Sequence, residues 1–416
     1  MQSTMRHAVL LALPIGLAVV ACSAPEASSL FVSGSSGQGS ATSSSTGGAG
    51  SGATGGGGAT GEGGGDAGGG GAGTGVVEPP TCGETYVDCD GDAENGCEVD
   101  VTGDALHCGT CPVECEGTCR AGACVAVTVH ATDQHEPLYI AAAGGNVFWT
   151  NGGVEGSVMQ WSRDGDTTIP LATGQVNPAG IASDGTHVFW VNQGVSGEDN
   201  GQVVRAPVGG GEDPVVVAAA QSDPFSVAVD EEFVYWVNRE SASLVRTRKS
   251  SRGNGPFVAI PTGGTPHALT VDATHVYWTL RDSGGRVMAA PKDARGDTPP
   301  TTLATDQGEV REIAVDATHV YWTTSRTGTV VRAPKAGGEA TVVARGLGNP
   351  RGIAADRTGI YWADPTSTDV MRAWPNGVTG AFAAGERSPL GIAVDAERVY
   401  WTNSLGRVGS IVSAPK

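Results

Sequence analysis

The chain has 416 residues, enough for two or three ordinary domains, and its formal net charge is −19. No stretch is rich in Lys or Arg, so nucleic acid and anionic lipid headgroups are poor partners for the polypeptide. Glycine accounts for 65 residues, and beyond residue 22 no segment keeps a 3.6-residue apolar period, which argues against helical bundles and α/β folds.

The first 21 residues predict a signal peptide. Arg6 and His7 precede an apolar run over 8–21, which as a helix rises about 21 Å and is too short for a hydrocarbon core of about 30 Å. The string Val-Val-Ala-Cys ending at Cys22 resembles the bacterial lipobox. That resemblance implies lipidation of Cys22 and anchoring in the cell envelope, by the outer membrane because no Asp follows the cysteine. The alternative is an ordinary cleavage site beside a stray cysteine.

Residues 22–80 are predicted to be a disordered tether behind the lipid anchor. From Gly34 to Gly75, 21 of 42 residues are glycine and large apolar side chains are almost absent. Such a stretch buries too little surface to offset its ordering entropy. As a random coil it spans about 35–40 Å, which would hold the folded part away from the membrane.

Residues 81–125 are predicted to be a small module held together by disulfides. After Cys22 is set aside, eight cysteines remain, an even number in a chain predicted to be exported. Zinc binding by Cys108 and Cys111 beside His107 is the alternative. The pairing is left open, because eight cysteines allow 105 connectivities. The cysteines are Cys82, Cys89, Cys97, Cys108, Cys111, Cys115, Cys119 and Cys124.

The same module contains a candidate Ca²⁺ site at Asp88, Asp90 and Asp92. Alternate acidic positions begin like an oxygen-ligand loop, but Ala93 and Val99 stand where such a loop has Gly and Glu. Plain acidic turns are the alternative. The string DCDG…NGCE followed by C-G-x-C resembles short modules of myxobacterial-type surface lipoproteins, which implies no activity. No other cofactor is expected.

The rest of the chain, residues 126–416, is built from one repeat. A Tyr-Trp or Phe-Trp pair recurs seven times at spacings of 39–46 residues. Each copy has four short β-branched runs separated by turns, which is typical of a propeller blade. The tryptophans are Trp149, Trp190, Trp236, Trp278, Trp322, Trp362 and Trp401. The sequence therefore predicts an all-β propeller of seven four-stranded blades, with six blades as the alternative.

The last copy ends before its fourth strand. An unassigned strand over residues 126–130 precedes the first copy, and we expect it to complete the final blade and close the ring.

The Tyr-Trp strings resemble the YWTD family of β-propellers, and more loosely the TolB-like and NHL groups. Only Asp364 supplies the final Asp of the motif. The resemblance implies a domain that binds proteins or acts as a scaffold, and six blades in most relatives.

An Asp six residues before the Trp recurs in every copy but the first, which has Ala143. We interpret these carboxylates as turn caps that accept backbone N–H groups rather than as a metal ring. His187, His275 and His319 share one turn position, which indicates a local structural role. The aspartates are Asp184, Asp230, Asp272, Asp316, Asp356 and Asp395.

The candidate ligand site is the channel mouth at the start of the innermost strands. Phe225, His267, Arg311 and Arg351 are its predicted residues, and the three basic ones favour an anionic or carboxylate-bearing ligand. Solvated loop charges are the alternative. Leu138, Ala179 and Leu390 occupy equivalent positions, and the loops after the Trp strands add Glu198, Asp199, Arg239, Arg281, Asp282 and Arg326.

No catalytic constellation is found. The sequence favours a non-catalytic envelope lipoprotein that presents a propeller to a protein or surface ligand and meets the membrane only through its anchor. A propeller enzyme, lyase or lactonase-like, that uses the channel mouth is the alternative, with His267 as its leading residue. A structural envelope component is the third possibility.

Overall fold

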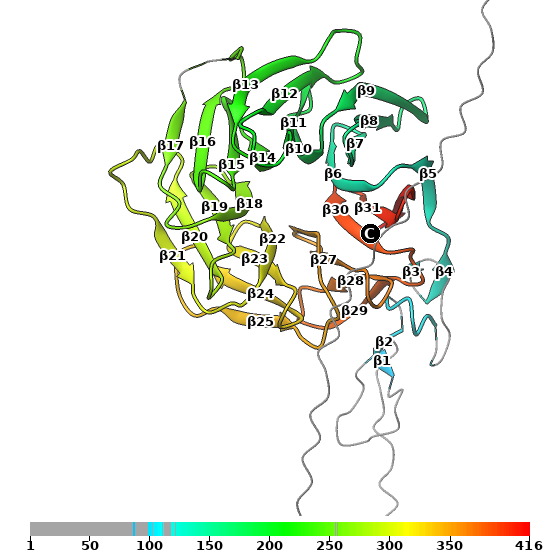
Figure 1. Cartoon of the computed structure of the whole chain (residues 1–416). Helices are drawn as coiled ribbons and strands as arrows, with labels where there is room; N and C mark the ends of the chain where they lie inside the picture. The colour runs from blue at the N-terminus through cyan, green and yellow to red at the C-terminus, as the bar shows by residue number, and fades with distance from the viewer. Residues whose placement is uncertain are drawn as a thin grey trace, which may run out of the picture. The chain divides into compact units, whose positions relative to one another are not determined.

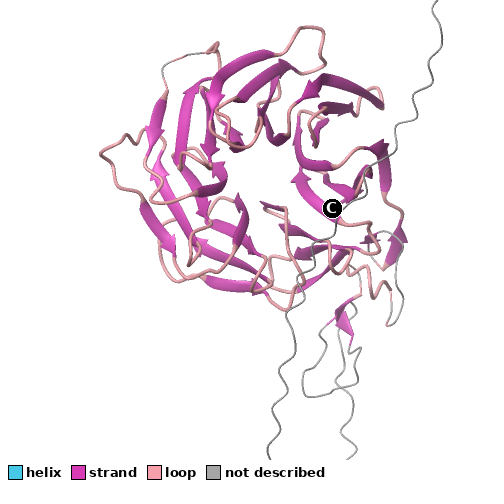
Figure 2. Ribbon diagram, in the orientation of Figure 1, coloured by secondary structure: helices cyan, strands magenta, loops and turns pink. Residues whose placement is uncertain are grey.

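The computed structural model describes residues 86–87, 99–101, 103–109, 111, 118–120, 122–253, 255 and 257–416. This part of the chain is all-β and forms a propeller of seven blades around a central axis (Figure 1). The predicted fold class and the count of seven blades are confirmed, and the alternative of six is wrong. No described residue belongs to a helix that is long and apolar enough to cross a membrane (Figure 2). The predicted signal peptide, Cys22 and the tether lie outside the described residues.

Each blade is an antiparallel sheet whose first strand lies nearest the axis (Figure 1). The first three blades contain β6 (Pro137–Ala143), β7 (Asn146–Asn151), β8 (Gly156–Ser162), β9 (Thr167–Gln175); β10 (Pro178–Ser183), β11 (His187–Asn192), β12 (Gly201–Pro207), β13 (Val215–Gln221); β14 (Pro224–Val229), β15 (Phe233–Asn238), β16 (Ser243–Arg248) and β17 (Val258–Ile260). The next three contain β18 (Pro266–Val271), β19 (His275–Leu280), β20 (Arg286–Pro291), β21 (Thr301–Ala304); β22 (Val310–Val315), β23 (His319–Thr324), β24 (Thr329–Pro334), β25 (Thr341–Ala344); β26 (Ile353–Asp356), β27 (Gly359–Asp364), β28 (Asp369–Ala373) and β29 (Thr379–Ala383). Blade seven contains β30 (Pro389–Val394), β31 (Arg398–Leu405), β32 (Val408–Pro415) and β5 (Thr128–Gln134).

The aromatic pair explains why the blades stack. Successive residues of a strand face opposite sides of a sheet, and both sides of an inner blade strand are covered by neighbouring blades. Phe148 of blade one packs in one buried cluster with Trp190 of blade two, and Phe189 of blade two packs with Trp236 of blade three. All seven repeat tryptophans are fully buried.

A buried amide links most neighbouring blades. In blade three, Trp236 Nε1 and Asn238 Nδ2 both donate to Oε1 of Gln221, the last residue of the outer strand of blade two, at 2.8 and 3.0 Å. In three other copies a glutamine also lies 15 residues before the repeat tryptophan and accepts from its Nε1. These residues are Gln134, Gln175 and Gln307. In blade seven its place is taken by Glu386, which accepts from Trp401 and Asn403 and whose pKa is raised by burial.

The recurring aspartates cap turns, as predicted. Asp272 Oδ1 accepts the backbone N–H groups of Thr274 and His275 at 2.7 and 2.8 Å. Its Oδ2 accepts from Tyr277 and lies 2.8 Å from Lys335 Nζ of the next blade. Corresponding ion pairs join Lys249 to Asp184, Lys292 to Asp230, and Lys416 to Asp356.

The junction of blades one and two replaces this ion pair with an apolar contact. Ala143 stands in the aspartate position, and Val208 follows β12 at the position where four other blades have Lys. Both pack against the same buried cluster. Loss of the acid is therefore matched by loss of its partner cation, which avoids an unpaired buried charge.

The ring closes through β5, as predicted, although the strand begins at Thr128 and extends to Gln134 rather than covering 126–130. It pairs with β32, whose eight residues supply an edge long enough for the additional residues. Trp149 and Asn151 of blade one then donate to Gln134 Oε1 at 2.9 and 3.0 Å.

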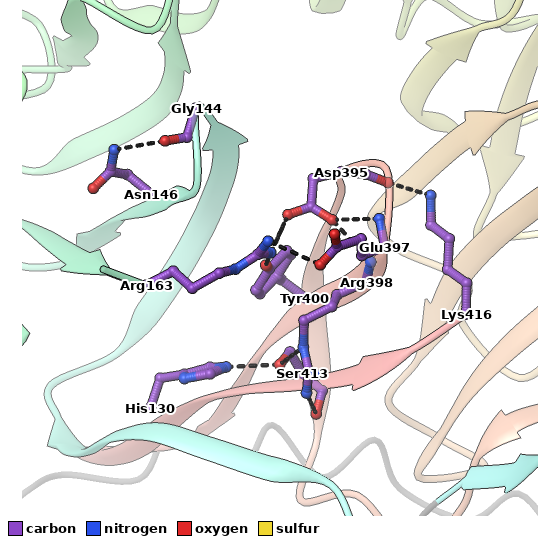
Figure 3. A network of polar contacts seen from close by, with 10 residues as sticks. All are labelled: His130, Gly144, Asn146, Arg163, Asp395, Glu397, Arg398, Tyr400, Ser413 and Lys416. Atoms are coloured by element: carbon purple, nitrogen blue, oxygen red, sulfur yellow. Dashed lines mark hydrogen bonds and ion pairs between the residues drawn. The ribbon is translucent and has the colours of Figure 1, made fainter. Parts of the chain in front are cut away.

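Charged groups reinforce this closure (Figure 3). Arg163 of blade one reaches Asp395, Glu397 and Tyr400 of blade seven, with its NH2 2.6 Å from Asp395 Oδ2. His130 Nε2 lies 2.6 Å from Ser413 Oγ, across the β5–β32 pair. Burial and then the charge of Arg398 lower the pKa of His130 to about 4, so this imidazole is neutral near pH 7.

The cysteine-containing segment packs on blade six. Its hairpin, β3 (Thr118–Arg120) and β4 (Ala123–Val125), continues the sheet of that blade beyond β29. Ala105 N donates to Ala381 O at 2.8 Å, and a Cβ at Gly103 would lie 2.8 Å from the Trp374 ring. A further pair of short strands, β1 (Tyr86–Val87) and β2 (Val99–Asp100), belongs to this segment.

Candidate functional site

A cavity of about 350 Å³ lies where the innermost strands begin. All seven blades contribute lining residues, so the ring geometry brings together side chains that are up to about 250 positions apart in sequence. Six of the seven predicted mouth positions line it: Leu138, Phe225, His267, Arg311, Arg351 and Leu390. The exception is Ala179, whose short side chain packs in a buried cluster with Phe189. Of the predicted loop residues, Arg239 and Arg281 also line the cavity.

Two of the cavity arginines each form an ion pair with an acidic residue of a loop. Arg239 Nε and NH2 donate to the two carboxylate oxygens of Asp223 at 2.7 and 3.0 Å. Arg281 forms an ion pair with Glu309. Asp223 and Glu309 therefore restrain these two guanidinium groups at the rim and neutralise part of their charge.

Arg311 and Arg351 carry the excess positive charge. Glu309, already paired with Arg281, also lies 2.8 Å from Arg311 NH2, so one carboxylate serves two guanidinium groups. Arg351 has no ion pair with any described residue, and its Nε is buried without a hydrogen-bond partner there. Burial and then the charges of Arg351 and Arg281 lower the pKa of Arg311, which shows how closely the cations are grouped.

An aromatic stack forms one wall of the cavity. The rings of Phe225 and His267 are stacked with centroids 4.4 Å apart, and the Arg239 guanidinium lies 4.1 Å from the centre of the Phe225 ring. Tyr139 meets the edge of Phe225 at 5.7 Å. His267 is 4% exposed, and burial followed by the surrounding arginines lowers its pKa to about 2. Its imidazole is therefore neutral, and Nδ1 has no partner among the described residues.

Glu312 is a cavity residue that the sequence analysis missed. Burial raises its pKa to about 7, and Arg311 and Arg351 partly oppose that rise. Tyr139 is its equivalent in blade one, and burial followed by the charge of Glu312 raises the tyrosine pKa. A signal was present in the sequence, because this position is small in the other five copies. Those residues are Gly180, Ser226, Ala268, Gly352 and Gly391.

Four of the eight predicted disulfide cysteines lie among the described residues. Cys108 is disulfide-bonded to Cys119, and Cys111 and Cys124 are disulfide-bonded as well. Disulfide sulfurs are not thiolates, so the zinc alternative at Cys108 and Cys111 is wrong. His107 instead lies 3.2 Å from Asp104.

The other candidate residues of this segment lie outside the described residues: Asp88, Asp90, Asp92, Cys82, Cys89, Cys97 and Cys115. Within the described part, no group of three or more His, Cys, Asp or Glu is placed to hold a metal ion. The three repeat histidines, His187, His275 and His319, each place Nδ1 against the hydroxyl of the preceding threonine.

No protein-family model matches the chain, and no curated protein is significantly similar to it. Among solved structures, virginiamycin B lyase from Staphylococcus aureus is 13% identical over 68% of this chain and 96% of that chain, with a TM-score of 0.56. The WD40 β-propeller domain of Doa1 is 15% identical over 70% of this chain and 97% of that chain, also with a TM-score of 0.56. A chain of a nidogen/laminin complex is 17% identical over 57% of this chain and 92% of that chain, and its TM-score of 0.46 is too low to support an argument. At these identities the likeness to the lyase and to Doa1 shows the propeller fold alone.

Proposed function

We propose that this protein is a non-catalytic binding protein whose propeller takes a ligand with an anionic group into its central cavity. The observation that carries the proposal is the convergence of four arginines on one cavity, with Arg351 left without an acidic partner in the described part. A carboxylate is suited to such a site, because it accepts two parallel N–H groups from one guanidinium. The charge argument is the same for a small molecule and for an acidic group of a protein.

The second candidate function is a propeller enzyme that uses the same cavity. His267 favours it, because its neutral imidazole lines the cavity and has an unpartnered Nδ1. A pKa lowered to about 2, however, makes the ring a weak base at neutral pH, whereas an efficient general base titrates near the working pH. This supports binding over acid–base catalysis. Full activity in His267→Ala would remove that histidine from the enzymatic alternative.

The charge preference can be tested with benzoate and benzamide, which have similar shapes and differ in charge. We expect benzoate to bind more tightly, and Arg351→Ala to weaken benzoate roughly ten- to a hundredfold while changing benzamide little. Isothermal titration calorimetry measures both affinities. Arg357→Ala is the matched control, because Arg357 lies in a turn and does not line the cavity. Equal affinities for the two compounds in the unmodified protein would contradict the proposal.

The same titration should depend on pH through Glu312. This carboxyl has a pKa raised to about 7, so below pH 7 it is mostly neutral and above pH 7 it adds a negative charge beside the arginines. Benzoate affinity is therefore expected to fall as pH rises from 6 to 8. In Glu312→Gln that fall should disappear, with tighter binding than the unmodified protein at pH 8. A pH dependence that persists unchanged in the variant would assign it to another group.

We place this binding function at the cell envelope, on the outer membrane, with the lipidated Cys22 as its only membrane contact. The lipobox-like string and the Gly/Ser-rich segment support this, since together they provide an anchor and a spacer. In bacterial cells, Cys22→Ser is expected to abolish incorporation of a radiolabelled or alkyne-tagged fatty acid and to move the protein out of the membrane fraction. Ser23→Ala is the control. Fatty-acid labelling that survives in Cys22→Ser would contradict the assignment.

A further inference from the structure

The lining of the central cavity is divided around the ring. Blades seven, one and two contribute no charged residue to it, and their innermost strands β30, β6 and β10 lie side by side (Figure 1). Blades three to six contribute every arginine and Glu312. One arc of the wall is therefore apolar, apart from the Tyr139 hydroxyl, and the opposite arc is basic. The apolar arc presents Leu390, Ile392, Leu138, Ile140 and Ile181.

The lining is also divided by depth. Each innermost strand leads away from the mouth and rises about 3.3 Å per residue, so the residue two positions after each mouth residue lies further along the axis. In six of the seven blades that second residue is aliphatic and lines the cavity. These residues are Ile140, Ile181, Val227, Leu269, Ile353 and Ile392. Beyond the level of the arginines, six of the seven blades therefore contribute an aliphatic side chain to the cavity lining.

Two polar groups at the boundary between these zones are left without partners. His267 is 96% buried, lines the cavity, and has no hydrogen-bond partner for Nδ1 in the described part of the chain. Arg351 Nε is also buried and has no hydrogen-bond partner among the described residues. A buried polar atom without a partner is unfavourable, and a ligand atom that pairs with it removes that cost. The unpaired groups therefore place the polar end of a ligand beside His267 and Arg351.

From this arrangement we infer that the ligand is an amphipathic carboxylate, with its anionic group at Arg311 and Arg351 and an apolar chain or ring on the aliphatic layer below. The inference rests on the proposed binding function and specifies its ligand class. The cavity volume of about 350 Å³ falls at the lower end of the range for small-molecule sites. A ligand with only a charge would leave the aliphatic layer uncovered, and a purely apolar ligand would leave the buried Nε of Arg351 unpaired.

The test is a series of straight-chain carboxylates, acetate, butanoate, hexanoate and octanoate, titrated into the full chain by calorimetry. We expect affinity to rise about fourfold for each added methylene until the cavity is filled. Hexanamide, which lacks the charge, should bind at least tenfold more weakly than hexanoate. In Arg351→Ala this advantage of the carboxylate should shrink, while the dependence on chain length remains.

A variant of the aliphatic layer tests the second half of the assignment. Ile181→Ala is expected to reduce the gain per methylene for the longer acids and to leave acetate unchanged. Val195→Ala, at a 47% exposed position away from the cavity, is the control. If Ile181→Ala fails to fold, the series on the unmodified protein still decides the question.

The outcomes separate the inference from the proposed function. Equal affinities for all four acids, each above that of its amide, would overturn the amphipathic assignment and leave anion binding intact. Equal affinities of hexanoate and hexanamide would overturn anion recognition, and with it both proposals. No binding by any member of the series would overturn both as well.

Discussion

Deletion of residues 126–136 is expected to destabilise all seven blades together. The deletion removes β5, so blade seven keeps three strands and the edge of β32 is left open. It also removes Gln134, which leaves Trp149 Nε1 and Asn151 Nδ2 without their acceptor at the junction with blade one. Two lost hydrogen bonds to buried donors cost about 2–6 kcal/mol before any loss of strand pairing is counted. Thermal unfolding followed by tryptophan fluorescence should show a large drop in melting temperature, and an unchanged one would contradict closure by this strand.

A pair of point substitutions on the same strand gives the matched control. Ala131 is 9% exposed and packs with Ile140, Trp149 and Ile411, whereas Val129 is 53% exposed. Ala131→Asp places an unpaired carboxylate in this cluster and is expected to cost several kcal/mol. Val129→Asp introduces the same charge in the same strand, and we expect a change within about 0.5 kcal/mol. Comparable effects of the two would mean that the strand contributes through its charge balance rather than its packing.

The sequence predicts the blades well because the repeat itself specifies them. In each copy the Tyr-Trp or Phe-Trp pair buries one ring on each face of the sheet. The pair therefore marks the second strand, whatever the loop lengths between copies. The closing strand was predicted because the seventh copy of the repeat contains three strands rather than four. The end of β5 was misplaced by four residues, because its length depends on how far β32 extends, and nothing in residues 128–134 encodes that length.

The sequence predicted residues at the rim of the cavity, but not the residues that line it further along the axis. Phe225, His267 and Arg351 were identified because each follows the linker proline, and Arg311 because it holds the same position in the copy that lacks that proline. The aliphatic layer could have been predicted from the residues two positions after the mouth residues, which are aliphatic in every copy. Glu312 was visible as the one acidic residue at a position that is small in most copies. The division into a basic and an apolar arc required all seven copies to be compared at each position.

The packing of the cysteine segment on blade six was not predictable in the same way. Residues 103–109 and 118–125 carry no periodic pattern that names a partner strand. The contact depends on single features such as Trp374, which follows β28 where four other blades have a lysine. Because that copy departs from the repeat at this point, the departure is a signal that something unusual covers the blade, but it does not identify what.

Replacement of Gln221 by leucine is expected to weaken the contact between blades two and three strongly. Gln221 Oε1 accepts from both Trp236 Nε1 and Asn238 Nδ2, so the variant removes two hydrogen bonds made by buried donors, at a cost of about 2–6 kcal/mol. Leucine fits the position, because Leu347 occupies it before Trp362 and packs against the same cluster as that tryptophan.

Gln307→Leu provides a graded comparison. Gln307 accepts from Trp322 alone at 3.2 Å, because Thr324 stands where four other copies have asparagine, so its removal should cost about 1–3 kcal/mol. Each glutamine also donates its Nε2 to a backbone carbonyl two residues earlier, so this loss is common to the two substitutions. Denaturant unfolding measures both free energies. A twofold ratio would assign the link between blades to hydrogen bonding, whereas equal costs would mean that the glutamine side chains act by filling space.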